Sequence, residues 1–251
     1  MKLDYKKIFR LKYILFGFLL FILIFSSWFY FSLPEVTFLK NENPKTTALM
    51  ELRKEQAKEA GKKFRLRQKW VRFQKIPELL KKAVRITEDS DFYGHEGIDW
   101  VELQESIKKN FEKGGLARGG STITQQLAKN LFLSTEKSFF RKFRELFITY
   151  RLENEISKNR IFHLYLNIIE FGPGVFGVQA ASRYYFKKDV SVLTLPQIVR
   201  LTAVIPKPLS VKASGNSRWL KWKARWILGK LKLYKYITVE QYNSAITEFK
   251  K

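Results

Sequence analysis

The chain has 251 residues and a formal net charge of +24. This length fits a membrane anchor followed by one domain of about 200 residues and leaves little room for a second catalytic domain. The lack of cysteine excludes a disulfide framework and a thiolate metal site, and two histidines are too few for a zinc cluster. The large positive charge implies an anionic partner, because self-repulsion of this size otherwise destabilises the folded state.

An uncharged segment rich in Leu, Ile and Phe spans residues 13–34. It is long enough to cross a hydrocarbon core of about 30 Å as a helix, so it predicts a transmembrane anchor. Residues 1–12 form a basic tail, which the positive-inside rule places in the cytoplasm, with the rest of the chain outside that membrane. A cleavable signal peptide is the alternative, but bulky aromatic residues follow Ser26 and Ser27, where a small-residue cleavage site is required.

Nucleic acid, acidic lipid head groups and pyrophosphate are the candidate partners for the positive charge. A membrane-anchored chain with its bulk outside the cytoplasm seldom meets nucleic acid, and the sequence contains no nucleic-acid-binding motif. The expected partners are therefore an anionic membrane surface and a pyrophosphate, with no nucleic acid.

Residues 35–69 carry many charges and few apolar side chains, and we interpret them as a basic linker between the membrane and a domain at residues 70–251. The alternative is a solvated helix, supported by ion pairs such as Glu51 with Lys54. Either arrangement could rest on anionic lipid head groups.

Beyond Ile76, apolar residues recur at three- and four-residue spacing with few alternating runs, which predicts a mainly α-helical fold. Thr122 and Gln125 form a capping-box pattern that opens a helix. A longer helix is expected over residues 138–157, with an apolar stripe turned inward. The residues of this stripe are Phe139, Phe143, Leu146, Phe147 and Tyr150.

Further helices are expected toward the C-terminus. Trp219, Trp222 and Trp226 recur at helical spacing and are expected in the core, although the basic residues between them also allow membrane contact. The remaining helices are expected to begin near Gly177, Thr194 and Thr238.

Two segments concentrate chemically capable side chains. Residues 88–97 read EDSDFYGHEG and combine acids with an aromatic pair, a histidine and glycines. Residues 119–130 read GGSTITQQLAKN and open a helix after two glycines, with a lysine on it. Solvated surface sequence rarely holds so many reactive residue types at such close spacing, and the two segments together indicate an enzyme.

These segments resemble the first two motifs of the peptidoglycan glycosyltransferases, and three later segments continue the resemblance in the same order. The matching region covers roughly residues 70–210 and is most similar to the monofunctional members of the family from Gram-negative bacteria. Lys187 departs from the pattern, because many relatives have a glycine there. The three later segments are Arg141-Lys142-x-x-Glu145, Lys158 with Tyr165-Leu166-Asn167, and Gly177-x-x-Ala180-Ala181 with Tyr185-Phe186.

The resemblance implies a lysozyme-like catalytic fold with a small membrane-facing lobe, preceded by the transmembrane helix. Glu88 matches the family's catalytic base. Glu145 matches its second glutamate, which stabilises the donor side or organises the site. Lys129 matches the lysine that contacts the donor's phosphates, and Asp89 is expected to support the local structure or a cation.

The other residues of the resemblance are assigned to substrate binding. The helix opened by Ser121 and Thr122 also favours an anion at its N-terminus, through its amides and its dipole. The full predicted substrate-binding set is Asp89, Phe92, Ser121, Thr122, Gln125, Gln126, Lys129, Asn130, Lys137, Arg141, Lys142, Tyr165 and Asn167.

Several of these residues have a structural alternative. Glu88 could cap its helix or pair with Arg85. Arg141 and Glu145 could form a simple ion pair, although Arg before Glu is the weaker orientation on a helix. His95, a single histidine among glycines, is more often a hydrogen-bonded structural residue than a base or a metal ligand.

The chemistry expected from the resemblance is glycosyl transfer from a lipid pyrophosphate. It requires a base for the attacking hydroxyl and positive charge for the departing phosphates. The protein is then expected to join lipid II to a lipid-linked glycan chain, forming β-1,4 bonds with inversion and releasing undecaprenyl pyrophosphate. A divalent cation, Mg²⁺ or Mn²⁺, is expected because pyrophosphate is a natural ligand for a hard cation, yet the sequence has no dedicated metal motif.

By the same resemblance, the protein is expected in the bacterial inner membrane as a single-pass protein with a periplasmic domain. Other cell-wall synthesis proteins are among its expected partners. Two alternatives stay open. One is a lytic enzyme of the same broad fold, which would need an acid near the glycosidic oxygen and no cationic pyrophosphate site. The other is a catalytically silent membrane scaffold.

Overall fold

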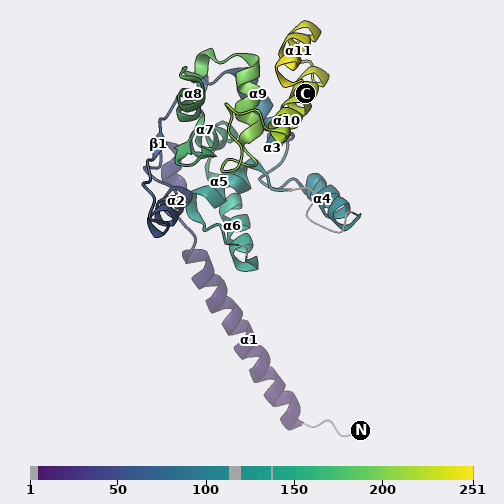
Figure 1. Cartoon of the computed structure of the whole chain (residues 1–251). Helices are drawn as coiled ribbons and strands as arrows, with labels where there is room; N and C mark the ends of the chain where they lie inside the picture. The colour runs from purple at the N-terminus through teal and green to yellow at the C-terminus, as the bar shows by residue number, and fades with distance from the viewer. Residues whose placement is uncertain (1–4, 113–119, 137, 251) are drawn as a thin grey trace. The chain divides into compact units, whose positions relative to one another are not determined.

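The computed structural model describes residues 5–112, 120–136 and 138–250 and divides the chain into two compact units, residues 1–35 and 36–251 (Figure 1). Two residues named above, Gly119 and Lys137, lie outside the described residues. The first unit contains the long helix α1 (Tyr5–Phe31). Within it, Lys12–Phe31 has a mean hydropathy of 2.3 and is long and apolar enough to cross a membrane. The predicted apolar N-terminal helix is confirmed.

The second unit is mainly helical, as predicted. A small sheet has the strand order β1-β3-β2, in which β1 and β3 are parallel and β2 and β3 are antiparallel. The sequence pattern did not predict these strands, because each is too short to show an alternating run. The strands are β1 (Arg67–Gln68), β2 (Glu170–Gly172) and β3 (Val175–Phe176).

The helices of the second unit form two neighbouring packed groups. In the first group, α5 contacts α2, α6 and α7, and in the second α3 contacts α9 and α10. Leu80 and Val84 on α3 and Ile123 and Leu127 on α5 have no exposed surface, so both groups contribute to the core. The α-helices are α2 (Ala48–Glu59), α3 (Glu78–Glu88), α4 (Trp100–Glu112), α5 (Ile123–Phe132), α6 (Phe139–Glu155), α7 (Lys158–Ile168), α8 (Val178–Phe186), α9 (Leu195–Val204), α10 (Arg218–Leu233) and α11 (Val239–Ile246).

Residues 36–69 differ from the expected linker. Leu39 and Met50 are buried, α2 packs against α5, and β1 joins the sheet, so this segment belongs to the second unit. The helical alternative holds instead, with Lys54 and Glu51 of α2 forming the expected ion pair at 3.8 Å. Charged residues dominate the exposed face of α2. Its two buried apolar residues, Leu49 and Met50, lie on the helix that packs against α5.

Two aromatic stripes face the surface instead of the core, contrary to expectation. On α6 the buried residues are Glu145, Ile148, Thr149 and Leu152, whereas the opposite face leaves its aromatic side chains exposed. The physical reason is that α5 packs on the face that carries Ile148 and Leu152, and a helical period alone does not identify the packed face. The exposed side chains are Phe139, Phe143, Phe147 and Tyr150.

The tryptophan stripe of α10 shows the same reversal. Trp222 and Trp226 are exposed, and Trp219 is half-buried. The buried face of α10 is built instead from aliphatic residues, which pack against α3 and α9. These residues are Leu220, Ala224, Ile227, Leu228 and Leu231.

Candidate active site

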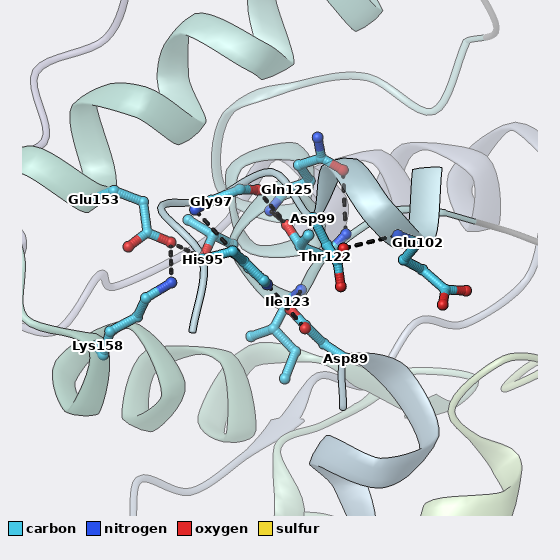
Figure 2. Close-up of polar contacts among 11 residues, drawn as sticks. Asp89, His95, Gly97, Asp99, Glu102, Thr122, Ile123, Gln125, Glu153 and Lys158 are labelled. Atoms are coloured by element: carbon cyan, nitrogen blue, oxygen red, sulfur yellow. Dashed lines mark hydrogen bonds and ion pairs between the residues drawn. The ribbon is translucent and has the colours of Figure 1, made fainter. Parts of the chain in front are cut away.

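A buried carboxylate joins the two sequence segments that carry the reactive side chains. Asp89 directly follows α3, and its Oδ2 accepts a hydrogen bond of 2.9 Å from the amide of Ile123, the first residue of α5 (Figure 2). Its Oδ1 lies 3.0 Å from Nε2 of His95. Because the Asp89 side chain is only 2% exposed, these bonds fix the end of α3 against the start of α5.

His95 serves this junction as a structural residue. The amide of Gly97 donates to His95 Nδ1 at 3.1 Å, so Nε2 carries the proton that is donated to Asp89. The carbonyl of Gly97 accepts a bond of 2.7 Å from the hydroxyl of Thr122. Gly97 has φ of 88°, and a Cβ at this position would lie 2.7 Å from Cγ2 of Thr149, so only glycine fits this turn.

The capping box predicted for α5 is confirmed. Thr122 Oγ1 accepts from the amide of Gln125 at 3.2 Å, and Gln125 Oε1 accepts from the amide of Thr122 at 3.1 Å. The hydroxyl of Thr122 and the side-chain oxygen of Gln125 therefore each accept a backbone amide at the start of α5. Gln125 is buried, and its amide oxygen accepts the bond that caps the start of the helix.

Glu88, the last residue of α3, lies beside Gln126 of α5. Gln126 Nε2 donates to Glu88 Oε2 at 3.2 Å, and Gln126 Oε1 accepts from the hydroxyl of Tyr165 at 3.0 Å. Burial raises the pKa of the Glu88 carboxyl, while the bond from Gln126 and the charges of Lys223 and Lys129 lower it in part. The alternative pairing with Arg85 is not what the structure has, because the Arg85 guanidinium lies over the ring of Tyr93, 4.9 Å from its centroid.

A cavity of about 620 Å³ opens beside Glu88. The end of α3 and the start of α5 form one side, and α10 forms another, so the cavity joins segments that are far apart in the sequence. The hydroxyl oxygen of Thr87 is buried without a hydrogen-bond partner among the described residues. The residues that line the cavity include Thr87, Glu88, Asp89, Ser121, Thr122, Lys223, Trp226, Lys230 and Tyr234.

Glu145 is the centre of a cluster of cations. Arg141 Nη1 lies 2.5 Å from Glu145 Oε2, and Lys142 Nζ lies 2.5 Å from Glu145 Oε1. Lys142 Nζ also lies 3.4 Å from the hydroxyl of Ser121, which connects the cluster to the start of α5. The Glu145 side chain is 3% exposed, so a desolvated carboxylate is paired with two cations that keep part of their surface in solvent, Arg141 at 18% and Lys142 at 41%.

Lys129 connects this cluster with Glu88. Burial lowers the pKa of its ammonium group, and the negative charges of Glu145 and Glu88 oppose that decrease. Arg141 and Lys142 act in the same direction as burial, because like charges disfavour the protonated amine. The predicted functional residues Glu88, Lys129, Arg141, Lys142 and Glu145 therefore form one continuous electrostatic group.

Four of the remaining predicted binding residues are buried inside the protein. Phe92 is completely buried, and Asn130 is 9% exposed. Asn167 is also buried; its side chain accepts from the amide of Val71 at 2.9 Å and donates to the carbonyl of Val71 at 3.2 Å. Tyr165 is fully buried and contacts Gln126. None of these four residues lines the cavity, and their part in substrate binding stays a prediction.

The residues of α10 on the cavity were not predicted as site residues. Lys223 Nζ lies 4.2 Å from the ring centroid of Trp226, and Lys230 Nζ lies 5.7 Å from the same centroid. Burial lowers the pKa of Lys223, and the charge of Glu88 opposes this decrease. The positions 223, 226, 230 and 234 share one helix face, which is the signal that could have identified them.

Asp89, His95 and Asp99 are the described residues whose ligand atoms could gather around a metal ion, lying within 4.8 Å of one another. Their atoms are already used: both nitrogens of His95 and both oxygens of Asp89 are hydrogen bonded, and Asp99 Oδ1 accepts from the amide of Glu102 at 2.8 Å. Mg²⁺ requires a near-octahedral set of free oxygen ligands. These residues therefore form a hydrogen-bond network and do not fit a dedicated metal site.

The geometry as a whole defines an enzyme that handles an anionic substrate, because a carboxylate of raised pKa and two lysines of α10 line one cavity, and Lys129 acts on the same carboxylate. Residues 54–232 match the transglycosylase family. A biosynthetic peptidoglycan transglycosylase of Nitrosospira multiformis is 41% identical over 85% of this chain and 93% of its own length. A protein of the same description from Thiobacillus denitrificans is 45% identical over 78% of this chain and 84% of its own length. The chain therefore belongs to the transglycosylase family.

Among solved structures, penicillin-binding protein 1A from Haemophilus influenzae is similar to this chain. The match has a TM-score of 0.43 and 20% sequence identity, and it covers 73% of this chain and 18% of that chain.

Proposed function

We propose that this member of the transglycosylase family is a peptidoglycan glycosyltransferase that polymerises glycan strands from lipid II. The observation that carries the proposal is the position of Glu88 on a cavity that is also lined by Lys223 and Lys230 of α10, while the charge of Lys129 on α5 acts on the same carboxylate. A substrate with a sugar hydroxyl to be activated and a pyrophosphate to be released needs both features.

The two glutamates have different roles in this proposal. Both oxygens of Glu145 are paired with cations, so Glu145 organises positive charge and is not available to take a proton. Glu88 is held through Oε2 only, by Gln126, and no hydrogen bond to its Oε1 is present among the described residues. Its raised pKa brings it closer to the pH at which a base works best. Glu88 is therefore the base.

The reaction proceeds by direct displacement. Glu88 takes the proton of the 4-hydroxyl on the acceptor's N-acetylglucosamine, and that oxygen attacks the anomeric carbon of the donor's N-acetylmuramic acid. A new carbon–oxygen bond forms as the bond between the anomeric carbon and the phosphate oxygen breaks, and undecaprenyl pyrophosphate leaves with the electron pair. Attack opposite the leaving group converts an α-linked phosphate into a β-1,4 bond. Because pyrophosphate leaves as a stable anion, no acid is needed to protonate it, and a single base suffices.

Lys129, Arg141 and Lys142 neutralise the charge that develops on the departing pyrophosphate. Glu145 holds Arg141 and Lys142 in place before the substrate arrives, which reduces the reorganisation needed during the reaction. Any divalent cation in the reaction would enter with the pyrophosphate as part of the substrate, because the network of Asp89, His95 and Asp99 does not fit one.

The acceptor lies between Glu88 and α10 in this proposal. Lys223 and Lys230 provide charge for the acceptor's own pyrophosphate, and the ring of Trp226 provides a flat apolar surface for a sugar. The unpartnered hydroxyl of Thr87 can bond to a sugar hydroxyl on the same side of the cavity. The lipid tails of both substrates require access from a membrane.

Membrane contact is provided by two apolar surfaces of the chain. We propose that helix α1 anchors the protein with its basic end in the cytoplasm and that the catalytic domain lies in the periplasm of a bacterial inner membrane; the positive-inside rule supports this orientation. The exposed aromatic face of α6 contacts the lipid surface, because Phe143 and Phe147 sit outside the core and basic residues lie close to them on the same helix.

The test is incubation of the detergent-solubilised full-length protein with purified lipid II. The expected products are a glycan polymer and one undecaprenyl pyrophosphate for each bond formed, with no cleavage of added polymer. Cleavage of polymer without synthesis would indicate the lytic alternative. If the protein is folded by circular dichroism and shows neither synthesis nor cleavage, the result would support the catalytically silent scaffold.

A further inference from the structure

A chain of hydrogen bonds reaches Glu88 from the core of the protein. Tyr165 of α7 has no exposed surface, and its hydroxyl donates to Gln126 Oε1 at 3.0 Å. Gln126 of α5 donates through Nε2 to Glu88 Oε2 at 3.2 Å. Three residues on three helices, α7, α5 and α3, therefore form one line of bonds that ends at the proposed base.

The hydrogen bonds run in one direction, from the Tyr165 hydroxyl through Gln126 to Glu88, because Tyr165 keeps its proton. Burial raises the pKa of its phenol well above the ordinary value, and the negative charges of Glu88 and Asp89 raise it further. A protonated phenol that donates to the oxygen of the Gln126 amide leaves the nitrogen of that amide turned toward Glu88. With the amide reversed, its oxygen would face the Glu88 carboxylate and would favour the protonated acid.

We propose that Tyr165 is a positioning residue for the transfer reaction: it fixes the amide of Gln126 so that one oxygen of Glu88 is held and the other is left to take the acceptor's proton. The inference rests on the proposed function of Glu88. Tyr165 lies in the protein core, so it acts on the reaction through Gln126 and not by touching the substrate.

Burial and three charged groups also act on the pKa of Glu88, and they are unchanged when Tyr165 is altered. Burial and the charge of Asp89 raise the pKa of Glu88, whereas Lys129 of α5 and Lys223 of α10 lower it. Removal of the Tyr165 hydroxyl alters the orientation of Gln126 alone. The bond from Gln126 lowers the pKa of Glu88, so its loss must raise that pKa and keep the base protonated up to a higher pH.

The experiment is the pH dependence of lipid II polymerisation by the full-length Tyr165→Phe protein. We expect the acid limb of the kcat profile to move to higher pH by about one unit, with a loss of kcat that approaches about tenfold at pH values below the wild-type limb. The KM for lipid II should stay within about twofold, since no substrate contact is removed. Activity should recover toward the wild-type value above the shifted limb, where Glu88 is ionised again.

Two further variants make the outcome decisive. Tyr184→Phe removes an exposed phenol hydroxyl on α8 and should leave the profile unchanged. Gln126→Leu removes the amide itself and should give the same shift as Tyr165→Phe, and the double variant should show no additional shift, because the two residues act in series. If Tyr165→Phe fails to fold, the Gln126→Leu profile decides, and an unshifted acid limb there overturns the proposal.

The failure of this inference is distinguishable from the failure of the proposed function. A wild-type profile for Tyr165→Phe, in protein whose Glu88→Gln variant is inactive, overturns the positioning role and leaves Glu88 as the base. A lower kcat without a shift of the acid limb also overturns it, because a purely structural defect lowers activity at every pH. Full activity in Glu88→Gln overturns the proposed base itself.

Discussion

Arg141 Nη1 lies 2.5 Å from Oε2 of Glu145, one helical turn along α6, and the pair is almost fully removed from solvent. The same carboxylate is bound by Lys142 through its second oxygen. A simple ion pair would account for the contact between Arg141 and Glu145 alone. Glu145, however, binds two cations and lies close to a third, Lys129, so positive charge is concentrated at one place. Glu145 therefore determines where the cations lie.

Substitution of Glu145 tests this organising role. Glu145→Gln removes the charge that holds Arg141 and Lys142, so we expect a loss of about 2 kcal/mol in the free energy of unfolding, because charged hydrogen bonds are lost from a buried site. We also expect the KM for lipid II to rise, since the cations no longer converge on the phosphates. Chemical denaturation and initial rates measure the two effects. An unchanged stability would mean that the ion pairs in the structure contribute nothing in solution.

Lys129 is tested by separating its charge from its shape. Lys129→Ala removes a half-buried cation and should reduce kcat/KM by about 100-fold, whereas Lys129→Arg keeps the charge and should lose less. The control is Lys58→Ala on α2, where the lysine side chain is 79% exposed, and this variant should be as active as the wild type. Initial rates across lipid II concentrations give the comparison. Equal losses for Lys129→Ala and Lys129→Arg would show that geometry, and not charge, is what matters at this position.

The exposed face of α6 is tested by a variant that leaves the core intact. Phe143→Ser/Phe147→Ser should lower the free energy of unfolding by about 1–2 kcal/mol, because the two rings are about half-buried and contact each other with centroids 4.8 Å apart. Polymerisation in liposomes should fall, while activity in detergent stays close to that of the wild type. The control on the opposite face is Ile148→Ala, which should destabilise the protein by about 3 kcal/mol because this side chain is completely buried. Equal activity of the double variant in liposomes and detergent would argue against lipid contact.

Much of the local structure could be predicted from the sequence. The capping box at Thr122 and the helix starts near Thr194 and Thr238 are set by contacts within a few residues, so a local pattern is enough to find them. The packed face of α6 could not be predicted in this way. Both of its faces show helical spacing of apolar residues, and only the position of α5 determines which one is buried.

In the candidate site, too, some residues could be predicted from local sequence and others depend on tertiary packing. Glu88, Lys129 and Glu145 were found because they lie in recognisable segments, and the structure places all three in one electrostatic group. The bond between Tyr165 and Gln126 joins residues 39 positions apart, and it depends on how α7 packs against α5. Lys223 reaches the cavity only because α10 packs against α3. Such contacts are set by tertiary packing and leave no local pattern.

Glu88→Gln provides a stability prediction that is separate from catalysis. Because the pKa of Glu88 is raised in the folded protein, the contribution of this one group to stability is fully present below its unfolded pKa and is lost as the pH rises through its folded pKa. The neutral glutamine avoids this decrease. We therefore expect Glu88→Gln to be at least as stable as the wild type at pH 7, with a difference that disappears below about pH 4, the pKa range of an unfolded glutamate. Thermal unfolding across this pH range checks the sign.

The rate of polymer formation from purified lipid II by folded Glu88→Gln tests the central claim most directly. Glutamine preserves the shape of the side chain but does not accept a proton, so we predict a loss of about 1,000-fold or more relative to the wild type. Glu55→Gln, which removes an exposed carboxylate from α2, should remain fully active as a control. A rate for Glu88→Gln within about tenfold of the wild-type rate would contradict the assignment of Glu88 as the base.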